Sequence, residues 1–163
     1  MSGWALDQDS FLGENREQQR AVQLAYRAIS TRERTVSEVR AFLERKELEQ
    51  ALIEYALGEL AESGALDDAR FARLFTEDRR CIDHWGVERI ERELRRRGVP
   101  GAEIDQALTG VDRTDELSAA VELLGQKVSP PESAKDRDRA WRLLVRKGYE
   151  PELAYEAVRA HAV

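Results

Sequence analysis

Apolar residues recur along this chain at the spacing of a helix, and no segment sustains the alternation of a strand. One set falls at offsets 0, 3, 4 and 7, which places its members on one helix face: Ile53, Ala56, Leu57 and Leu60. Two further sets also fall on one helix face: Phe71, Leu74, Phe75 and Ile82 at offsets 0, 3, 4 and 11, and Trp141, Leu144, Val145 and Gly148 at offsets 0, 3, 4 and 7. The pattern predicts an all-α chain.

Residues that start and stop helices divide this pattern into elements. Thr35 and Glu38 have the spacing of a capping box, and Ser133 and Asp136 form a looser version of it. Glycines after helical runs supply C-terminal caps, and Pro100 and Pro151 suit helix starts. Residues 1–16 lack periodicity and are predicted to be a disordered tail. Helices are predicted near 17–31, 36–46, 49–63, 68–83, 87–97, 100–109, 114–127, 134–147 and 151–161.

The predicted helices repeat in threes. Leu43, Leu94 and Leu144 lie 51 and 50 residues apart, and apolar, basic and turn positions keep register around each of them. A fixed period of this length is typical of stacked supersecondary units that share a core. We therefore expect an elongated, curved monomer of three tandem three-helix repeat units, at 17–66, 67–112 and 113–163.

One turn departs from the repeat. Gly98 and Gly148 follow the second and third repeat helices, whereas Glu47 occupies this position in the first. Either the first turn is built differently, or a non-glycine residue there carries backbone strain. The sequence leaves both open.

Composition narrows the function classes. The 163 residues have a formal charge of −6, so general attraction to nucleic acid is not expected. The single cysteine, Cys81, excludes an intramolecular disulfide and is predicted to be a packed thiol. No apolar run approaches the length of about 20 residues that crosses a bilayer. We expect a soluble, cytoplasmic protein without a membrane segment.

The sequence shows no recognisable group of catalytic residues. His84 and His161 are far apart, and neither has metal-ligand spacing to Cys, Asp or Glu. Asp67 and Asp68 lack the further oxygen ligands of a cation loop, and helix-dipole stabilisation explains them. No glycine-rich phosphate loop is present. The sequence predicts no catalytic residues, no metal site and no cofactor, so a hydrolytic enzyme is disfavoured.

Basic residues are more informative. A cationic pair follows each repeat leucine by two and three positions, which either complements the helix dipole or forms a binding surface. Residues 79–99 hold seven arginines against four acids, although the chain is acidic. Arg89, Arg92 and Arg96 fall on one helix face, and this face either binds a partner or is simply solvated. The predicted binding residues are Arg89, Arg92, Arg96, Arg97, Arg45, Lys46, Arg146 and Lys147.

Three stretches resemble the RecX regulatory proteins. Residues 64–75, reading Gly-Ala-Leu-Asp-Asp-Ala-Arg-Phe-Ala-Arg-Leu-Phe and followed by Arg79, are similar to the opening of that family's second unit. Residues 86–99, with Gly86, Ile90, Glu93-Leu94 and Gly98, are similar to its continuation. Residues 32–39 look like the first-unit entry, with Val39 where leucine is commoner. The resemblance covers about residues 17–163.

The resemblance implies a function. RecX proteins bind the recombinase RecA, lie along the groove of the RecA–DNA filament, and restrain its growth, ATP hydrolysis, strand exchange and cleavage of the SOS repressor. The family has no catalytic residues. We therefore expect a non-enzymatic regulator of RecA in DNA repair, with weak direct DNA binding. The alternative is a direct DNA-binding protein, because three-helix units with a basic helix resemble helix-turn-helix folds.

Overall fold

The computed structural model describes residues 3–163, and for residues 3–11 it describes the backbone alone. All regular structure in this range is helical, which confirms the predicted fold class. The helices are α1 (Gly3–Ser30), α2 (Val36–Arg45), α3 (Gln50–Glu62), α4 (Asp68–Cys81), α5 (Val87–Arg96), α6 (Gly101–Leu108), α7 (Arg113–Lys127), α8 (Ala134–Lys147) and α9 (Pro151–His161). Each bound after α1 lies within two residues of its prediction.

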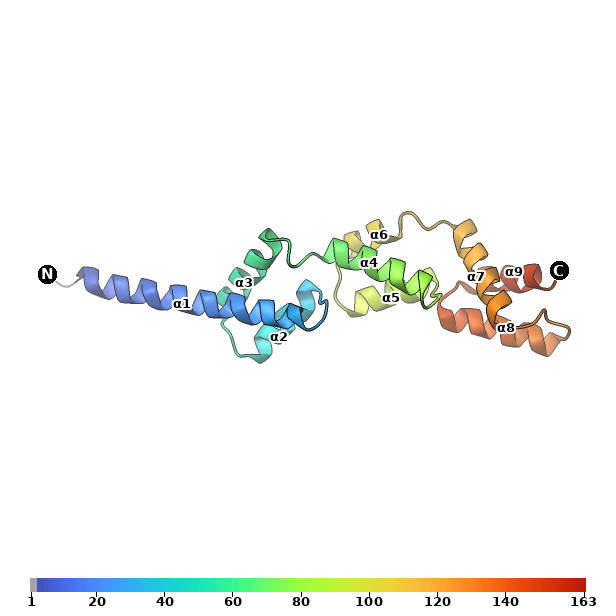
Figure 1. Cartoon of the computed structure of the whole chain (residues 1–163), viewed down its shortest axis with the longest axis horizontal. Coiled ribbons are helices and arrows are strands. Elements are labelled where there is room, and N and C mark those ends of the chain that lie inside the picture. Colours follow the sequence, from blue (N-terminus) through green and yellow to red (C-terminus); the bar gives the residue numbers. More distant parts are fainter. Residues whose placement is uncertain (1–2) are drawn as a thin grey trace. The chain divides into compact units, whose positions relative to one another are not determined.

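The N-terminal segment differs from the prediction. Residues 3–16, expected to be a disordered tail, belong to α1 (Figure 1). Helix propagation adds one hydrogen bond for each residue that is fixed, so a helix held at one end can extend beyond the residues that hold it. Ala21, Ala25 and Ala28 are buried and hold the C-terminal half of α1 in place. Residues 3–16 can therefore continue α1 without apolar residues at helical spacing.

Helix ends follow their capping residues. Thr35 and Ser133 each accept a hydrogen bond from the amide three residues on, and Glu38 and Asp136 complete both capping boxes. Asp67 caps α4 by accepting from the amide of Arg70 at 3.0 Å. The capping box at the start of α7 was not predicted, because Asp takes both of its positions.

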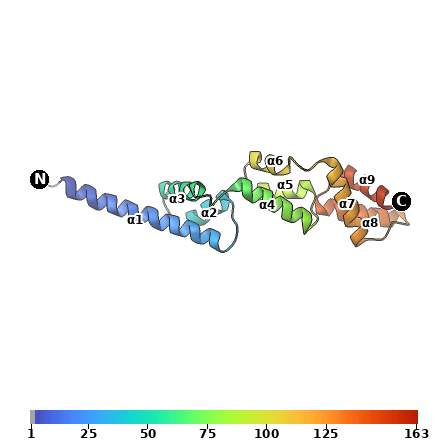
Figure 2. The same cartoon turned by 45° about the horizontal axis from the view of Figure 1, so that its top comes forward.

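The described helices gather into two compact units. Unit 1 contains the chain up to Phe71 together with Arg97–Val99, and unit 2 contains Ala72–Arg96 and Pro100–Val163. In unit 1, α1 lies along α2 and α3 (Figures 1 and 2). In unit 2, α9 packs against α7 and α8 (Figure 2). Unit 2 contains most of the predicted second repeat together with the third.

The repeat leucines lie in the cores of these units. Leu43, Leu94 and Leu144 are completely buried, as the period predicts. Unit 1 has one hydrophobic cluster around Leu43, and unit 2 has another around Leu144. The 3.6-residue pattern therefore identified the buried faces.

Two residues near the end of α4 depart from the prediction. Ile82 was placed on the apolar face with Phe71, but it is 71% exposed. Cys81, predicted to be packed, is also exposed. The α-helix ends at Cys81, so the helical period does not continue to Ile82.

The turn at Glu47 has the geometry of the glycine turns. Glu47 has φ 57°, in the left-handed region that Gly98 (77°) and Gly148 (93°) also occupy. After both α2 and α8, the amide that follows the left-handed residue donates a hydrogen bond to the carbonyl of the repeat leucine. Leu48 donates to Leu43, and Tyr149 donates to Leu144. These bonds define a Schellman cap. Of the two alternatives for this turn, the strained non-glycine residue is correct.

Replacing Glu47 with glycine should therefore stabilise unit 1. A non-glycine residue in the left-handed region costs about 1–2 kcal/mol, and glycine loses more backbone entropy on folding, so we expect a gain of about 1 kcal/mol. Urea denaturation would measure it. Glu47→Ala is the matched control: it removes the same carboxylate but keeps the Cβ, so it should give little gain. Equal gains from both variants would show that charge removal, rather than strain, is responsible.

Candidate functional site

The eight basic residues predicted to bind a partner have different structural roles. Three belong to unit 1 and five to unit 2. Those in unit 1 are Arg45, Lys46 and Arg97, and those in unit 2 are Arg89, Arg92, Arg96, Arg146 and Lys147. Some of these side chains are held in internal contacts, and others are exposed to solvent.

Arg97 belongs to an internal network of unit 1. Its guanidinium makes two hydrogen bonds to the Glu38 carboxylate, at 2.9 and 3.0 Å, and lies 4.4 Å from the centre of the Phe71 ring. Its carbonyl accepts a 2.6 Å hydrogen bond from the hydroxyl of Thr35, which is completely buried. The Arg97 side chain is only 14% exposed. Arg97 therefore holds the Arg97–Val99 segment of unit 1 against the start of α2 and offers little surface to a partner.

The same network sets the titration of Glu38. Burial alone raises the pKa of this carboxyl group, but the hydrogen bond from Arg97, the amide of Thr35 and the charges of Arg97 and Arg32 outweigh it. The net pKa is lowered. Glu38 therefore stabilises the folded state above its unfolded pKa, and this contribution is lost as pH falls through the folded pKa.

In unit 2, Arg89 and Lys147 hold the start of α5 against the end of α8. Lys147 Nζ donates to the carbonyl of Asp83 at 2.7 Å. The Arg89 guanidinium lies 3.9 Å from the centre of the Trp85 ring and donates to the carbonyl of Arg146 at 3.1 Å. These bonds bring predicted residues from the second and third repeats together. The guanidinium of Arg89 and the ammonium of Lys147 thus stabilise the fold as well as contributing to the surface.

A close backbone approach underlies this junction. The Gly86 amide donates to the carbonyl of Lys147 at 2.8 Å. A Cβ on Gly86 would lie 2.3 Å from the carbonyl oxygen of Gly148, and no side chain fits there. Position 86 therefore requires glycine because its backbone packs directly against the backbone of Gly148.

A buried carboxylate completes the junction. Glu116 of α7 accepts from Arg80 of α4 at 2.8 Å and from the amide of Val87 at the start of α5 at 3.2 Å. Burial raises the pKa of Glu116 and outweighs the opposing effects of Arg80 and the Val87 amide, while the charge of Glu88 raises it further. Sequence analysis missed this residue, although it shares a helical face with buried Ala120 and Leu123.

The remaining predicted cations are exposed. Arg45 and Lys46 lie at the end of α2, with Lys46 Nζ 5.5 Å from the centre of the Phe42 ring. Arg92 is exposed on α5, and Arg96 of the same face bonds to Glu93 at 2.9 Å. Arg146 is exposed at the end of α8.

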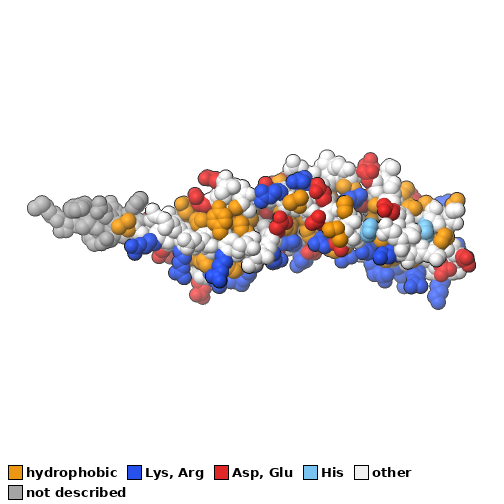
Figure 3. Space-filling view, viewed as in Figure 1, with side chains coloured by type: hydrophobic (Ala, Val, Ile, Leu, Met, Phe, Trp, Pro, Cys, Tyr) orange, Lys and Arg blue, Asp and Glu red, His pale blue; other side chains and the backbone are white. Residues whose placement is uncertain are grey.

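A second basic face, on α8, was not predicted. Lys135, Arg139, Arg142 and Arg146 lie at offsets 0, 4, 7 and 11 and are all exposed. We call these four residues the α8 basic stripe. Figure 3 shows basic side chains gathered over α8. The test of helical spacing that grouped Arg89, Arg92 and Arg96 would also have found this stripe in the sequence.

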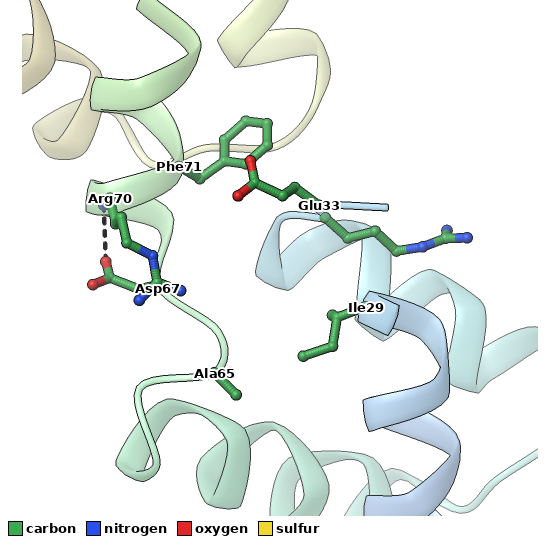
Figure 4. Close-up of a pocket in the computed structure, with 7 residues that line it drawn as sticks. Ile29, Glu33, Ala65, Asp67, Arg70 and Phe71 are labelled. Carbon is green, nitrogen blue, oxygen red and sulfur yellow. Dashed lines mark hydrogen bonds between the residues drawn. The ribbon is translucent and has the colours of Figure 1, made fainter. Parts of the chain in front are cut away.

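Unit 1 contains a small hollow of about 200 Å³ between the end of α1 and the start of α4 (Figure 4). Asp67 and Arg70 lie at one side of it, and Ile29 and Ala65 at the other. Asp67 and Arg70 are both exposed, and Asp67 already caps α4. The hollow has the mixed lining of an ordinary surface depression.

Within residues 12–163, whose side chains the structure describes, no three His, Cys, Asp or Glu side chains gather as metal ligands would. None of the described helices combines the length and the apolar character that a membrane crossing requires.

Comparison with known proteins assigns the family. Residues 67–108 match the family model for RecX, second three-helix domain. The chain is 32% identical over 143 residues to the regulatory protein RecX of Amycolatopsis mediterranei, an alignment that covers 86% of this chain and 82% of the relative. The chain belongs to the RecX family. The matched residues 67–108 include Arg80 and Arg97, whose contacts are described above.

Other RecX proteins extend the match. The regulatory protein RecX of Deinococcus radiodurans is 33% identical over 147 residues, covering 88% of this chain and 70% of the relative. That of Halalkalibacterium halodurans is 31% identical over 144 residues, and the match spans 86% of this chain but only 54% of the longer relative.

Solved structures of RecX proteins have the same fold. The crystal structure of RecX from Lactobacillus salivarius superimposes with a TM-score of 0.78 at 16% identity, covering 90% of this chain and 97% of that one. A second crystal structure, of a regulatory protein RecX, superimposes with a TM-score of 0.79 at 21% identity, covering 94% of this chain and 78% of that one. At these identities the likeness concerns the fold.

Proposed function

We propose that this RecX chain is a regulator that binds RecA, or the RecA filament on DNA, and restrains its ATP hydrolysis, strand exchange and coprotease activity. The observation that carries the proposal is the match to regulatory proteins RecX over 86% of the chain. Regulation of this kind uses a protein surface and needs no catalytic residues. The protein is thus proposed to be a non-enzymatic member of the DNA-repair and SOS response, acting in the cytoplasm as a monomer.

Surface chemistry supports the proposal. A helical repeat protein offers a large surface to a large partner. Residues 44–70 carry eight acids against three basic residues, whereas α8 carries six basic residues against two acids. Opposite charges on different parts of one chain suit a partner that presents both protein and phosphate. The exposed cations Arg45, Lys46, Arg92, Arg96 and Arg146 remain the proposed contact residues.

The test uses RecA filaments formed in advance on single-stranded DNA. Adding the purified chain at or below the concentration of RecA should slow ATP hydrolysis and strand exchange. Forming the filaments first, in the presence of excess free DNA, prevents simple competition for DNA from giving the same result. Unchanged rates for hydrolysis and strand exchange, with no co-sedimentation of the chain with filaments, would reject the proposal.

A further inference from the structure

The α8 basic stripe is a straight row of cations on the solvent side of its helix. Ala140 and Leu144 are buried on the opposite side of α8. At a rise of about 1.5 Å per residue, the stripe from Lys135 to Arg146 extends about 16 Å, with about 4.5–6 Å between neighbouring positions. The row is set by helical geometry, so its spacing does not depend on loops.

Helix stability does not account for this row. Cations favour the last turn of a helix and are disfavoured in the first. The dipole therefore explains Arg146 but not Lys135, which lies in the first turn of α8. Both Lys135 and Arg139 occupy the half of the helix where a positive charge gains least.

Internal ion pairs do not account for it either. Arg142 pairs with Asp138 at 3.0 Å, and both side chains are more than half exposed. Asp136, the other acid of α8, is engaged by the amide and hydroxyl of Ser133. Over the side chains described in residues 12–163, no ion pair holds Lys135, Arg139 or Arg146. Three of the four cations thus keep their charge available to a ligand.

The stripe borders two open hollows and a further arginine. A hollow of about 500 Å³ runs along all four of its residues. A second hollow, of about 380 Å³, adjoins it at Arg139 and reaches Lys127 at the end of α7 and Pro130 of the loop before α8. At the other end, Arg89 donates to the carbonyl of Arg146, so the guanidinium of α5 continues the stripe. Three acids, Glu132, Asp136 and Asp138, also line these hollows. The surface is therefore long and shallow, with an excess of positive charge.

A chain of evenly spaced anions fits such a surface. Guanidinium groups bind phosphate oxygens through paired hydrogen bonds, and a row of them tracks a phosphodiester backbone. The stripe carries no aromatic side chain on which bases could stack, which is the feature of proteins that bind bases of single strands. The chain as a whole is acidic, so we expect the phosphates to contact this basic surface and not the rest of the chain.

We propose that the α8 basic stripe, continued by Arg89 of α5, binds the phosphate backbone of nucleic acid without regard to base sequence. This binding requires no recombinase and is therefore an activity separate from the proposed regulation of RecA. Failure of either claim leaves the other standing.

The test is direct binding to labelled oligonucleotides, measured by fluorescence anisotropy over a series of salt concentrations. The probes are a single strand of thymidines, a single strand of mixed sequence, and a duplex, all of one length. The test variant is Arg139→Gln with Arg146→Gln. The control is Arg73→Gln with Arg95→Gln, two exposed arginines of unit 2 that pair with Glu77 and Glu91 on α4 and α5. Both variants remove two positive charges.

The parent should bind all three probes, with little difference between the two single strands. Each lost phosphate contact lowers the slope of log affinity against log salt by about 0.9 for duplex and about 0.7 for single strands. The test variant should therefore lose about 1.8 or about 1.4 from this slope, and the control should keep the parent's slope.

Three outcomes would overturn the inference: no binding by the parent at low salt, equal losses in test variant and control, or displacement of the oligonucleotide by polyglutamate as effective as displacement by unlabelled DNA. The last would assign the stripe to an acidic protein surface. Matching circular dichroism and urea denaturation of all variants ensure that the comparison concerns binding and not folding.

Discussion

Replacing Arg80 with methionine should destabilise unit 2 by about 3 kcal/mol at neutral pH. Arg80 and Glu116 are both largely buried, with side chains 19% and 10% exposed. Removing one partner leaves the other charge buried without compensation, which costs about 3–5 kcal/mol in comparable pairs. Urea denaturation followed by tryptophan fluorescence reports mainly on unit 2, which contains Trp85 and Trp141.

A double variant separates the charge from the packing. Arg80→Met with Glu116→Gln removes the uncompensated carboxylate and keeps an oxygen that can accept from the Val87 amide. It should recover most of the lost stability. If the double variant is as unstable as the single one, the loss comes from the packing of Arg80 and not from an unpaired charge.

The effect of Arg80→Met should also depend on pH. Burial raises the folded-state pKa of Glu116 above its unfolded value. For such a group, the stabilising contribution is complete below the unfolded pKa, about 4.3, and is lost as pH rises through the folded pKa. At pH 4 Glu116 is largely protonated, so the difference between variant and parent should be much smaller than at pH 7. A pH-independent difference would contradict the buried-charge explanation.

Replacing Leu94 with alanine should cost about 2–5 kcal/mol. Leu94 is completely buried on α5, as is Ile90 one turn before it. A large-to-small change in a core loses the transfer free energy of the removed methyl groups and leaves a cavity. The same urea denaturation measures the loss.

Leu94→Met is the matched control, because it keeps most of the volume and the apolar character of the side chain. It should cost less than about 1.5 kcal/mol. A loss within experimental error for Leu94→Ala would mean that Leu94 faces solvent and that the helical phase of α5 is wrong.

The sequence predicted the helices and their buried faces because both depend on local periodicity. Leu43, Leu94 and Leu144 are buried where the period of about 50 residues places them. The capping boxes at Thr35 and Ser133 could be predicted because a capping side chain acts within three residues. The division into three repeats, the elongated shape and the monomeric state remain predictions.

The binding role of the candidate residues remains a prediction, and charge in a sequence does not reveal which cations have internal partners. Arg97 was grouped with Arg92 as a binding residue, yet Arg97 is held by Glu38 and lies against Phe71. Glu38 and Arg97 are far apart in the chain, so no local pattern pairs them. Lys147 and Arg89 are likewise engaged by carbonyl groups of distant residues.

By itself, the sequence determined the helical class, the boundaries of the helices after α1 and the family resemblance, since these rest on residue spacing within one helix or one turn. Only the tertiary structure decided which charged side chains pair with other groups inside the fold. It pairs Glu116 with Arg80, it brings the backbones of Gly86 and Gly148 together, and it leaves the α8 basic stripe in solvent. The physical reason is that desolvation and pairing depend on neighbours in space, which helical periodicity does not specify.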